Sequence, residues 1–164
     1  DKATGYKALA FHAVNSDFPI FDDIQKFVVD RGKAAGAGDQ IGTVLYNRGM
    51  YNAMLITEAA RTAQAIAGKS NISQADMIKG FEALEMTEEK MAALGLPGFG
   101  PSFSVSCENH GGDGMVAVAQ WDAGAGKWSI VSDFQASDMS VIQPLIDADS
   151  GAFASENNLS PNCN

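Results

Sequence analysis

The sequence predicts an α/β fold that ends in an antiparallel strand pair and a last helix. Three observations predict it. Runs with strand character alternate with amphipathic helical patterns in the order β, α, β, α, α over residues 5–95. Residues 122–126, DAGAG, stand between two further strand-like runs and have the composition of a hairpin turn. The chain holds 164 residues, 46% of them hydrophobic, so it can bury the core of one ordinary domain.

The first half predicts Rossmann-like βα units. Residues 5–14, GYKALAFHAV, carry apolar side chains on both faces, which is typical of a buried strand in a mixed or parallel sheet. A helix is expected from residue 19 to about 31, with Pro19 near its start. Residues 41–45 are β-branched and aliphatic and predict a second strand. A long helix then runs from about Met50 and ends at Gly68.

The second half predicts two short helices, a hairpin and a C-terminal helix. Ser73 and Asp76 form a capping-box pattern at the start of a helix over residues 74–84, and a shorter helix is expected over residues 87–94. Strands are expected over residues 103–106, 115–121 and 127–134. The last helix covers residues 139–157, and Pro144 should kink its start.

Charge and motif content exclude several classes of function. The net charge of −9 and the isoelectric point near 4.5 argue against nucleic acid or an anionic membrane as partner. The sequence has neither of the two glycine-rich nucleotide-binding patterns, and we expect no cofactor. The chain begins at Asp1 without a methionine, from which we expect that a targeting segment has been removed.

The two histidines do not indicate catalysis. His12 lies within an apolar strand, where a core or hinge histidine is expected. His110 lies in residues 107–113, CENHGGD, where Cys, Glu, His and Asp could suggest a metal site. That spacing matches no standard zinc or calcium pattern, and its glycines favour a tight structural loop. We therefore expect no enzyme activity and no metal.

The candidate ligand site is the loop between the second strand and the long helix. Ligands of α/β folds lie outside the carboxyl ends of strands, against a helix N-terminus that favours carboxylates. The residues expected at that edge are Tyr46, Asn47, Arg48 and Tyr51. Arg48 could bind a carboxylate with two parallel hydrogen bonds, or it could form a surface ion pair with a neighbouring acid.

The two cysteines, Cys107 and Cys163, are 56 residues apart, and neither belongs to a C-x-x-C pair. A structural disulfide that ties down the tail, in an oxidising compartment, fits an even pair of this kind. Two free thiols are the alternative, and the spacing leaves both open.

Three motifs in order give the sequence a family resemblance. They are YNRG…EAARTAQ at residues 46–64, SCENHGG at 106–112 and QWDAGAGKW at 120–128. Together they resemble the C-terminal part of bacterial ABC-transporter substrate-binding proteins, the type I periplasmic binding proteins of the leucine/isoleucine/valine-binding class. The resemblance implies a segment of a two-lobed protein, with lobe-one elements over about 15–100. Hinge strands, a second-lobe return and the C-terminal helix would cover about 101–164.

The resemblance also implies a function. The protein would bind a small hydrophobic or branched-chain amino acid in an interlobe cleft in the periplasm and present it to an ABC permease in the inner membrane. An aromatic-acid, amide or urea binding protein, or the ligand-sensing domain of a signalling receptor, is the alternative. The resemblance supports a Cys107–Cys163 disulfide. Because the segment alone would expose apolar surface, we expect that a homodimer covers it.

Overall fold

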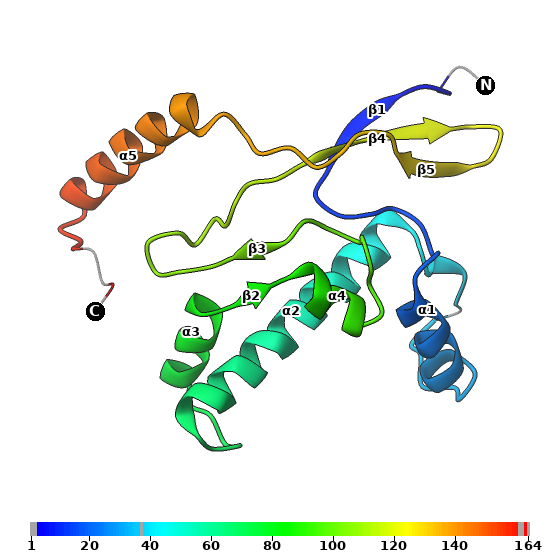
Figure 1. The fold of residues 1–164 in the computed structure, drawn as a ribbon, viewed down its shortest axis with the longest axis horizontal. Helices are drawn as coiled ribbons and strands as arrows, with labels where there is room; N and C mark the ends of the chain where they lie inside the picture. Colours follow the sequence, from blue (N-terminus) through cyan, green and yellow to red (C-terminus); the bar gives the residue numbers. More distant parts are fainter. Residues whose placement is uncertain (1–2, 37, 161–162, 164) are drawn as a thin grey trace.

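The computed structural model describes residues 3–36, 38–160 and 163, and Figure 1 shows their arrangement. Helices and strands are mixed, as the sequence predicts, but every strand pair in the described residues is antiparallel. In chain order the elements are β1 Lys7–Ala10, α1 Pro19–Ile24, the π-helix η1 Gln25–Val29, the 3-10 helix η2 Gly38–Gln40, α2 Val44–Ala67, α3 Gln74–Glu82, β2 Glu85–Met86, α4 Glu88–Ala93, β3 Phe103–Ser104, β4 Ala117–Asp122, β5 Lys127–Ile130 and α5 Met139–Glu156.

The helix α2 is the longest element and begins earlier than predicted. Thr43 is its N-cap, because the Thr43 Oγ1 accepts a hydrogen bond from the Tyr46 amide at 3.4 Å. Gly68 ends the helix in the left-handed conformation, as predicted. The predicted strand over residues 41–45 is wrong. Gly42 turns the chain at a φ of +86°, and the cap that follows draws Val44 into the helix despite its β-branched side chain.

Small residues bring α3 close to α2 (Figure 1). Gly80 faces Ala59 and Ala63, and a Cβ atom at residue 80 would overlap the Ala59 carbonyl oxygen and lie 2.7 Å from the Ala63 Cβ. The predicted capping box is confirmed, because Ser73 and Asp76 exchange side-chain-to-backbone hydrogen bonds at the start of α3. Local signals therefore set where α3 begins, and the missing side chain of Gly80 sets how closely it packs.

The larger sheet has the strand order β1-β4-β5. The predicted hairpin is confirmed, with Trp121 opposite Trp128 across the β4–β5 pair. The first strand is shorter than residues 5–14, and its prediction as a strand buried on both faces is wrong. Its residues are exposed or half-buried, because β1 lies at the edge of the sheet and pairs only with β4 in the described part of the chain.

The main core lies between α2, α4 and the segment around Phe99. Met86, Leu96 and Phe99 are fully buried there, against Tyr51 from α2 and Phe21 from α1. The helix predicted over residues 19 to about 31 divides into α1 and η1, and it ends near the predicted boundary. Burial of these apolar side chains is what holds the first hundred residues together.

The last helix, α5, lies apart from the other elements (Figure 1). It covers nearly the predicted residues and contains Pro144, yet each of its residues except Ala154 is exposed. The Cys107–Cys163 disulfide joins the tail beyond α5 to the loop after β3 and confirms the predicted bond. Among the described residues, no helix combines the length and the apolar character that a membrane crossing requires.

Candidate functional site

The predicted ligand residues lie in the first two turns of α2, not in a loop after a strand. Asn47 is fully buried, and its Nδ2 donates to the Ala13 carbonyl at 3.2 Å and to the Asn15 carbonyl at 2.9 Å. These bonds hold the segment that leaves β1 against the helix. The Asn47 Oδ1 atom has no hydrogen-bond partner within the described residues. Asn47 therefore positions backbone and does not face outward.

Tyr46 also packs inward. Its half-buried ring lies 6.3 Å from the Phe21 ring, on the side of α2 that faces α1. Because consecutive residues of a helix are about 100° apart, Tyr46 and Arg48 point to nearly opposite sides of α2. The four predicted residues consequently do not converge on one point.

Arg48 is exposed, and its guanidinium lies over the Phe11 ring at 4.8 Å. No carboxylate of the described residues forms an ion pair with it, so the alternative of a surface ion pair is not what the fold contains. Arg48 also lines a cavity of about 120 Å³ together with His12 and Trp128. Its donors remain directed at solvent, where an anionic or aromatic group could reach them.

Tyr51 is buried one turn further along α2, and burial raises the pKa of its hydroxyl to about 12. Its ring is tilted against Phe99 at 5.3 Å. Tyr51 and Phe11 line an open cavity of about 260 Å³, whose other side is lined by residues 101–103 and 111–115. Phe11 thus lines the cavity on the Tyr51 side, and its ring also lies under the Arg48 guanidinium.

His12 is buried in the core, as predicted, with its ring stacked on Phe99 at 5.3 Å. Burial lowers its pKa below the ordinary value, against the opposing hydrogen bond to Ala13, and the charge of Arg48 lowers the pKa further. The neutral ring donates from Nδ1 to the Ala13 carbonyl at 2.8 Å, which leaves Nε2 as an acceptor. Within the described residues, Nε2 has no partner.

Sequence reasoning missed Phe11, His12 and Glu58 as neighbours of this region. Glu58 is buried and paired with Arg61 at 2.5 Å and Lys90 at 3.4 Å, which joins α2 to α4. An Arg three residues after a Glu on a helix is a signal for the first pair. The contact between Phe11 and Arg48 joins the segment after β1 to α2, 37 residues further along the chain, and no local pattern indicates it.

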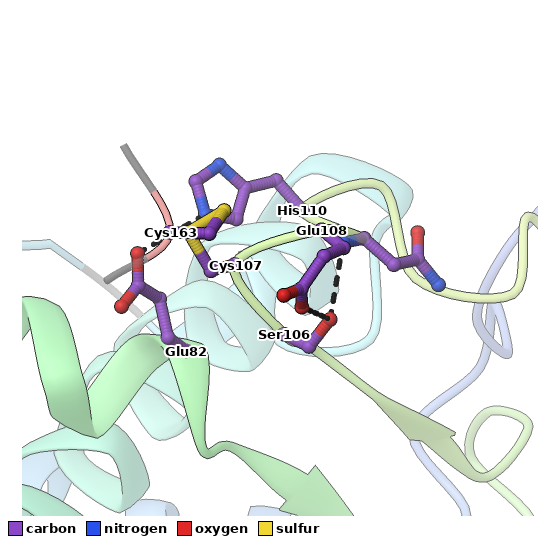
Figure 2. The surroundings of a disulfide bond; sticks show 7 residues. Glu82, Ser106, Cys107, Glu108, His110 and Cys163 are labelled. Carbon is purple, nitrogen blue, oxygen red and sulfur yellow. Dashed lines mark hydrogen bonds and ion pairs between the residues drawn. A yellow bond between two sulfur atoms is a disulfide. The ribbon is translucent and has the colours of Figure 1, made fainter. Parts of the chain in front are cut away.

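A second cluster surrounds the disulfide (Figure 2). Glu82 ends α3, and its Oε1 lies 3.4 Å from the His110 Nε2. Residues 106–109 form a tight turn, in which the Ser106 and Asn109 backbones exchange hydrogen bonds of 3.2 Å. The expected structural loop is therefore present, and it brings His110 next to an acid from another element.

One solved structure resembles almost the whole chain. It is described as the crystal structure of an ABC transporter permease from the Pseudomonas fluorescens group. The identity is 34%, the TM-score is 0.88, and the match covers 99% of this chain. This chain spans 39% of the length of that protein. No protein-family model matches the chain, and no curated protein matches it.

This comparison overturns the interpretation as a substrate-binding protein of the leucine/isoleucine/valine class, because the similar protein is described as a permease. The alternative of an aromatic-acid, amide or urea binding protein is overturned by the same finding. The motif residues on which that interpretation was based have structural roles in this fold. Asn47 holds backbone, Glu58 and Arg61 form an ion pair, and Cys107 forms the disulfide. Motifs of this kind report a shared architecture, which several functions can use. The similarity to an ABC-transporter component stands, and the division near residue 100 stays a prediction.

Proposed function

We propose that this chain is a segment of an ABC-transporter component that takes part in moving a solute across a membrane. The observation that carries the proposal is the match to the protein described as an ABC transporter permease, which extends over 99% of this chain. An identity of 34% at a TM-score of 0.88 means that side chains are shared as well as backbone shape. A periplasmic location and the absence of catalysis stay predictions.

The part of this segment best suited to touch a transported solute is the edge formed by Phe11, Arg48 and Tyr51. Arg48 supports this role because it is a charged group without an ion-pair partner among the described residues, supported on an aromatic ring. Tyr51 and Phe11 add an apolar cavity of about 260 Å³ beside it. Tyr46 and Asn47 would keep this edge in place through their packing and hydrogen bonds.

The first experiment asks whether the longer protein that carries this segment belongs to an ABC transporter. The tagged protein is crosslinked in cells, purified in mild detergent and analysed by mass spectrometry. We expect an ATP-binding subunit in stoichiometric amount, and we expect that deletion of the gene abolishes ATP-dependent uptake of at least one solute. A purified protein without an ATP-binding subunit, together with unchanged uptake in the deletion strain, would refute the proposal.

A second experiment tests the edge itself. Arg48→Ala is compared with Arg31→Ala, because both arginines are exposed and lie over a phenylalanine ring, at 4.8 and 5.2 Å. Loss of a charge-assisted contact should lower uptake by Arg48→Ala about tenfold or more, while Arg31→Ala keeps normal uptake. Equal uptake by the two variants would remove the edge from the mechanism and leave the transporter assignment untouched.

A further inference from the structure

The cluster around the disulfide brings four metal-ligating side chains together from three parts of the chain. Glu82 ends α3, Cys107 and His110 belong to the loop after β3, and Cys163 lies in the tail. One ligand atom each from Glu82, Cys107 and His110 lie within 4.8 Å of one another. Figure 2 shows the carboxylate and the imidazole beside the sulfur bridge.

We propose that reduction of the Cys107–Cys163 disulfide converts this cluster into a Zn²⁺ site with four protein ligands. Two thiolates, one imidazole and one carboxylate are donors that Zn²⁺ accepts, and four ligands complete its usual tetrahedral shell. While the bridge is intact, both sulfurs are bonded to each other, and only His110 and Glu82 are left as good donors. The disulfide therefore controls access to the site.

One distance in the cluster already matches that of a tetrahedral centre. Usual Zn–N and Zn–O bond lengths place a nitrogen and an oxygen ligand about 3.4 Å apart. The His110 Nε2 and the Glu82 Oε1 are already separated by 3.4 Å. The two sulfurs, which are bonded to each other in the disulfide, must lie about 3.7 Å apart in the zinc site. Among the described residues that precede Cys163, Leu159 and nearly all of α5 are exposed, so this movement would break little buried packing there.

Access and charge also fit an ion that enters from solvent. The His110 side chain is 67% exposed and that of Glu82 is 27% exposed, so an ion can reach both. Two thiolates and a carboxylate carry three negative charges against the two positive charges of Zn²⁺. The site is thus electrostatically favourable once the thiols have lost their protons.

The chemistry balances with a phosphine as the reductant. The disulfide accepts two electrons from the phosphine, the S–S bond breaks, and water supplies the oxygen of the phosphine oxide and the two protons of the thiols. Binding of Zn²⁺ then forms two Zn–S bonds and releases those two protons to solvent.

The test is a Zn²⁺ titration of the full chain, before and after reduction with a water-soluble phosphine, read by competition with a chromophoric chelator. We expect one Zn²⁺ per reduced chain and an affinity at least about 100-fold lower in the oxidised chain. Replacement of Zn²⁺ by Co²⁺ should give the visible absorption of a tetrahedral ion with a thiolate charge-transfer band. Alkylation followed by mass spectrometry should show that Zn²⁺ protects both cysteines.

Variants distinguish this site from general binding by exposed acids. His110→Ala and Glu82→Gln should each weaken Zn²⁺ binding by the reduced chain at least about tenfold. Glu108→Gln is the matched control, because Glu108 lies in the same loop but accepts a hydrogen bond from the Ser106 hydroxyl at 3.1 Å. Equal affinity of oxidised and reduced chains, no binding after reduction, or an equal effect of Glu108→Gln would each overturn the proposal.

Discussion

The region around α2 and the helix α5 are both rich in apolar residues, yet those around α2 are largely buried and those of α5 are exposed. Phe99 in the core is 0% exposed, whereas Phe153 on α5 is 61% exposed. Around α2, small residues such as Gly80 let neighbouring helices approach, so that apolar side chains leave water. No element of the described residues covers α5 in this way, and the Cys107–Cys163 bond ties down the tail that follows it.

The comparison teaches that apolar composition does not by itself place a helix in a core. The position of α2 depends on the burial of apolar side chains, which a reductant does not affect. The tail after α5 depends on a covalent bond that a reductant can break. The two regions should therefore differ in how strongly they respond to comparable changes. Four predictions, two of which compare them directly, follow.

The largest difference is expected between two phenylalanine deletions. Phe99→Ala should lower the free energy of unfolding by about 3–5 kcal/mol, because it empties a fully packed position. Phe153→Ala should change it by less than about 0.5 kcal/mol, because the side chain has little packing to lose. Urea denaturation followed by circular dichroism measures both. Similar losses in the two variants would show that α5 is packed on the core in solution.

A smaller difference is expected between two glycine substitutions in helices. Gly80→Ala should cost about 1–3 kcal/mol, since the new methyl group meets the Ala59 backbone. Gly151→Ala in α5 meets nothing within 4 Å and should instead raise helix content, because alanine is favoured over glycine by up to about 1 kcal/mol. Denaturation and far-ultraviolet circular dichroism report the two effects. A Gly80→Ala variant with the same unfolding free energy as the unsubstituted chain would contradict the close approach of α2 and α3.

The third prediction concerns pH and the buried His12. Its pKa is lowered in the folded chain, so the unfolded chain binds the proton more readily. The contribution of His12 to the free energy of unfolding is therefore fully present above a pH of about 6.5. It is lost as the pH falls toward the folded pKa, at no more than about 1.4 kcal/mol per pH unit. His12→Gln should flatten this dependence, whereas His110→Ala, in the exposed loop, should keep it. If the unfolding free energy of His12→Gln depends on pH as steeply as that of the unsubstituted chain, another group causes the dependence and the prediction is wrong.

The smallest effect on folding is expected from the exposed apolar surface of α5. Leu145 and Phe153 are 63% and 61% exposed, and we expect a homodimer to cover such residues. Replacing both with serine should shift the chain toward the monomer in light scattering without lowering its unfolding free energy. If the unsubstituted chain is already a monomer at every concentration tested, the expected homodimer is wrong.

Local signals predicted the elements whose causes lie within a few residues. The capping box at Ser73, the glycine stop at Gly68 and the hairpin turn at residues 122–126 were all readable, because each depends on nearby atoms. The strand over residues 41–45 was not, since strand propensity lost to the Gly42 turn and the Thr43 cap. The earlier start of the helix also explains the error in the candidate site. With α2 beginning at Val44, Tyr46 and Asn47 face the protein interior and not a ligand.

The sequence by itself determined the start of α3, the end of α2, the hairpin, the core position of His12 and a cysteine pair that could join. Each of these follows from spacing, capping or hydrophobic patterning along the chain. Only the tertiary structure decided that β1 pairs antiparallel with β4, that Arg48 lies over Phe11, and that Glu82 meets His110 beside the disulfide. These contacts join residues 28 to 113 positions apart, and their free energy depends on how whole elements pack, which no local pattern carries.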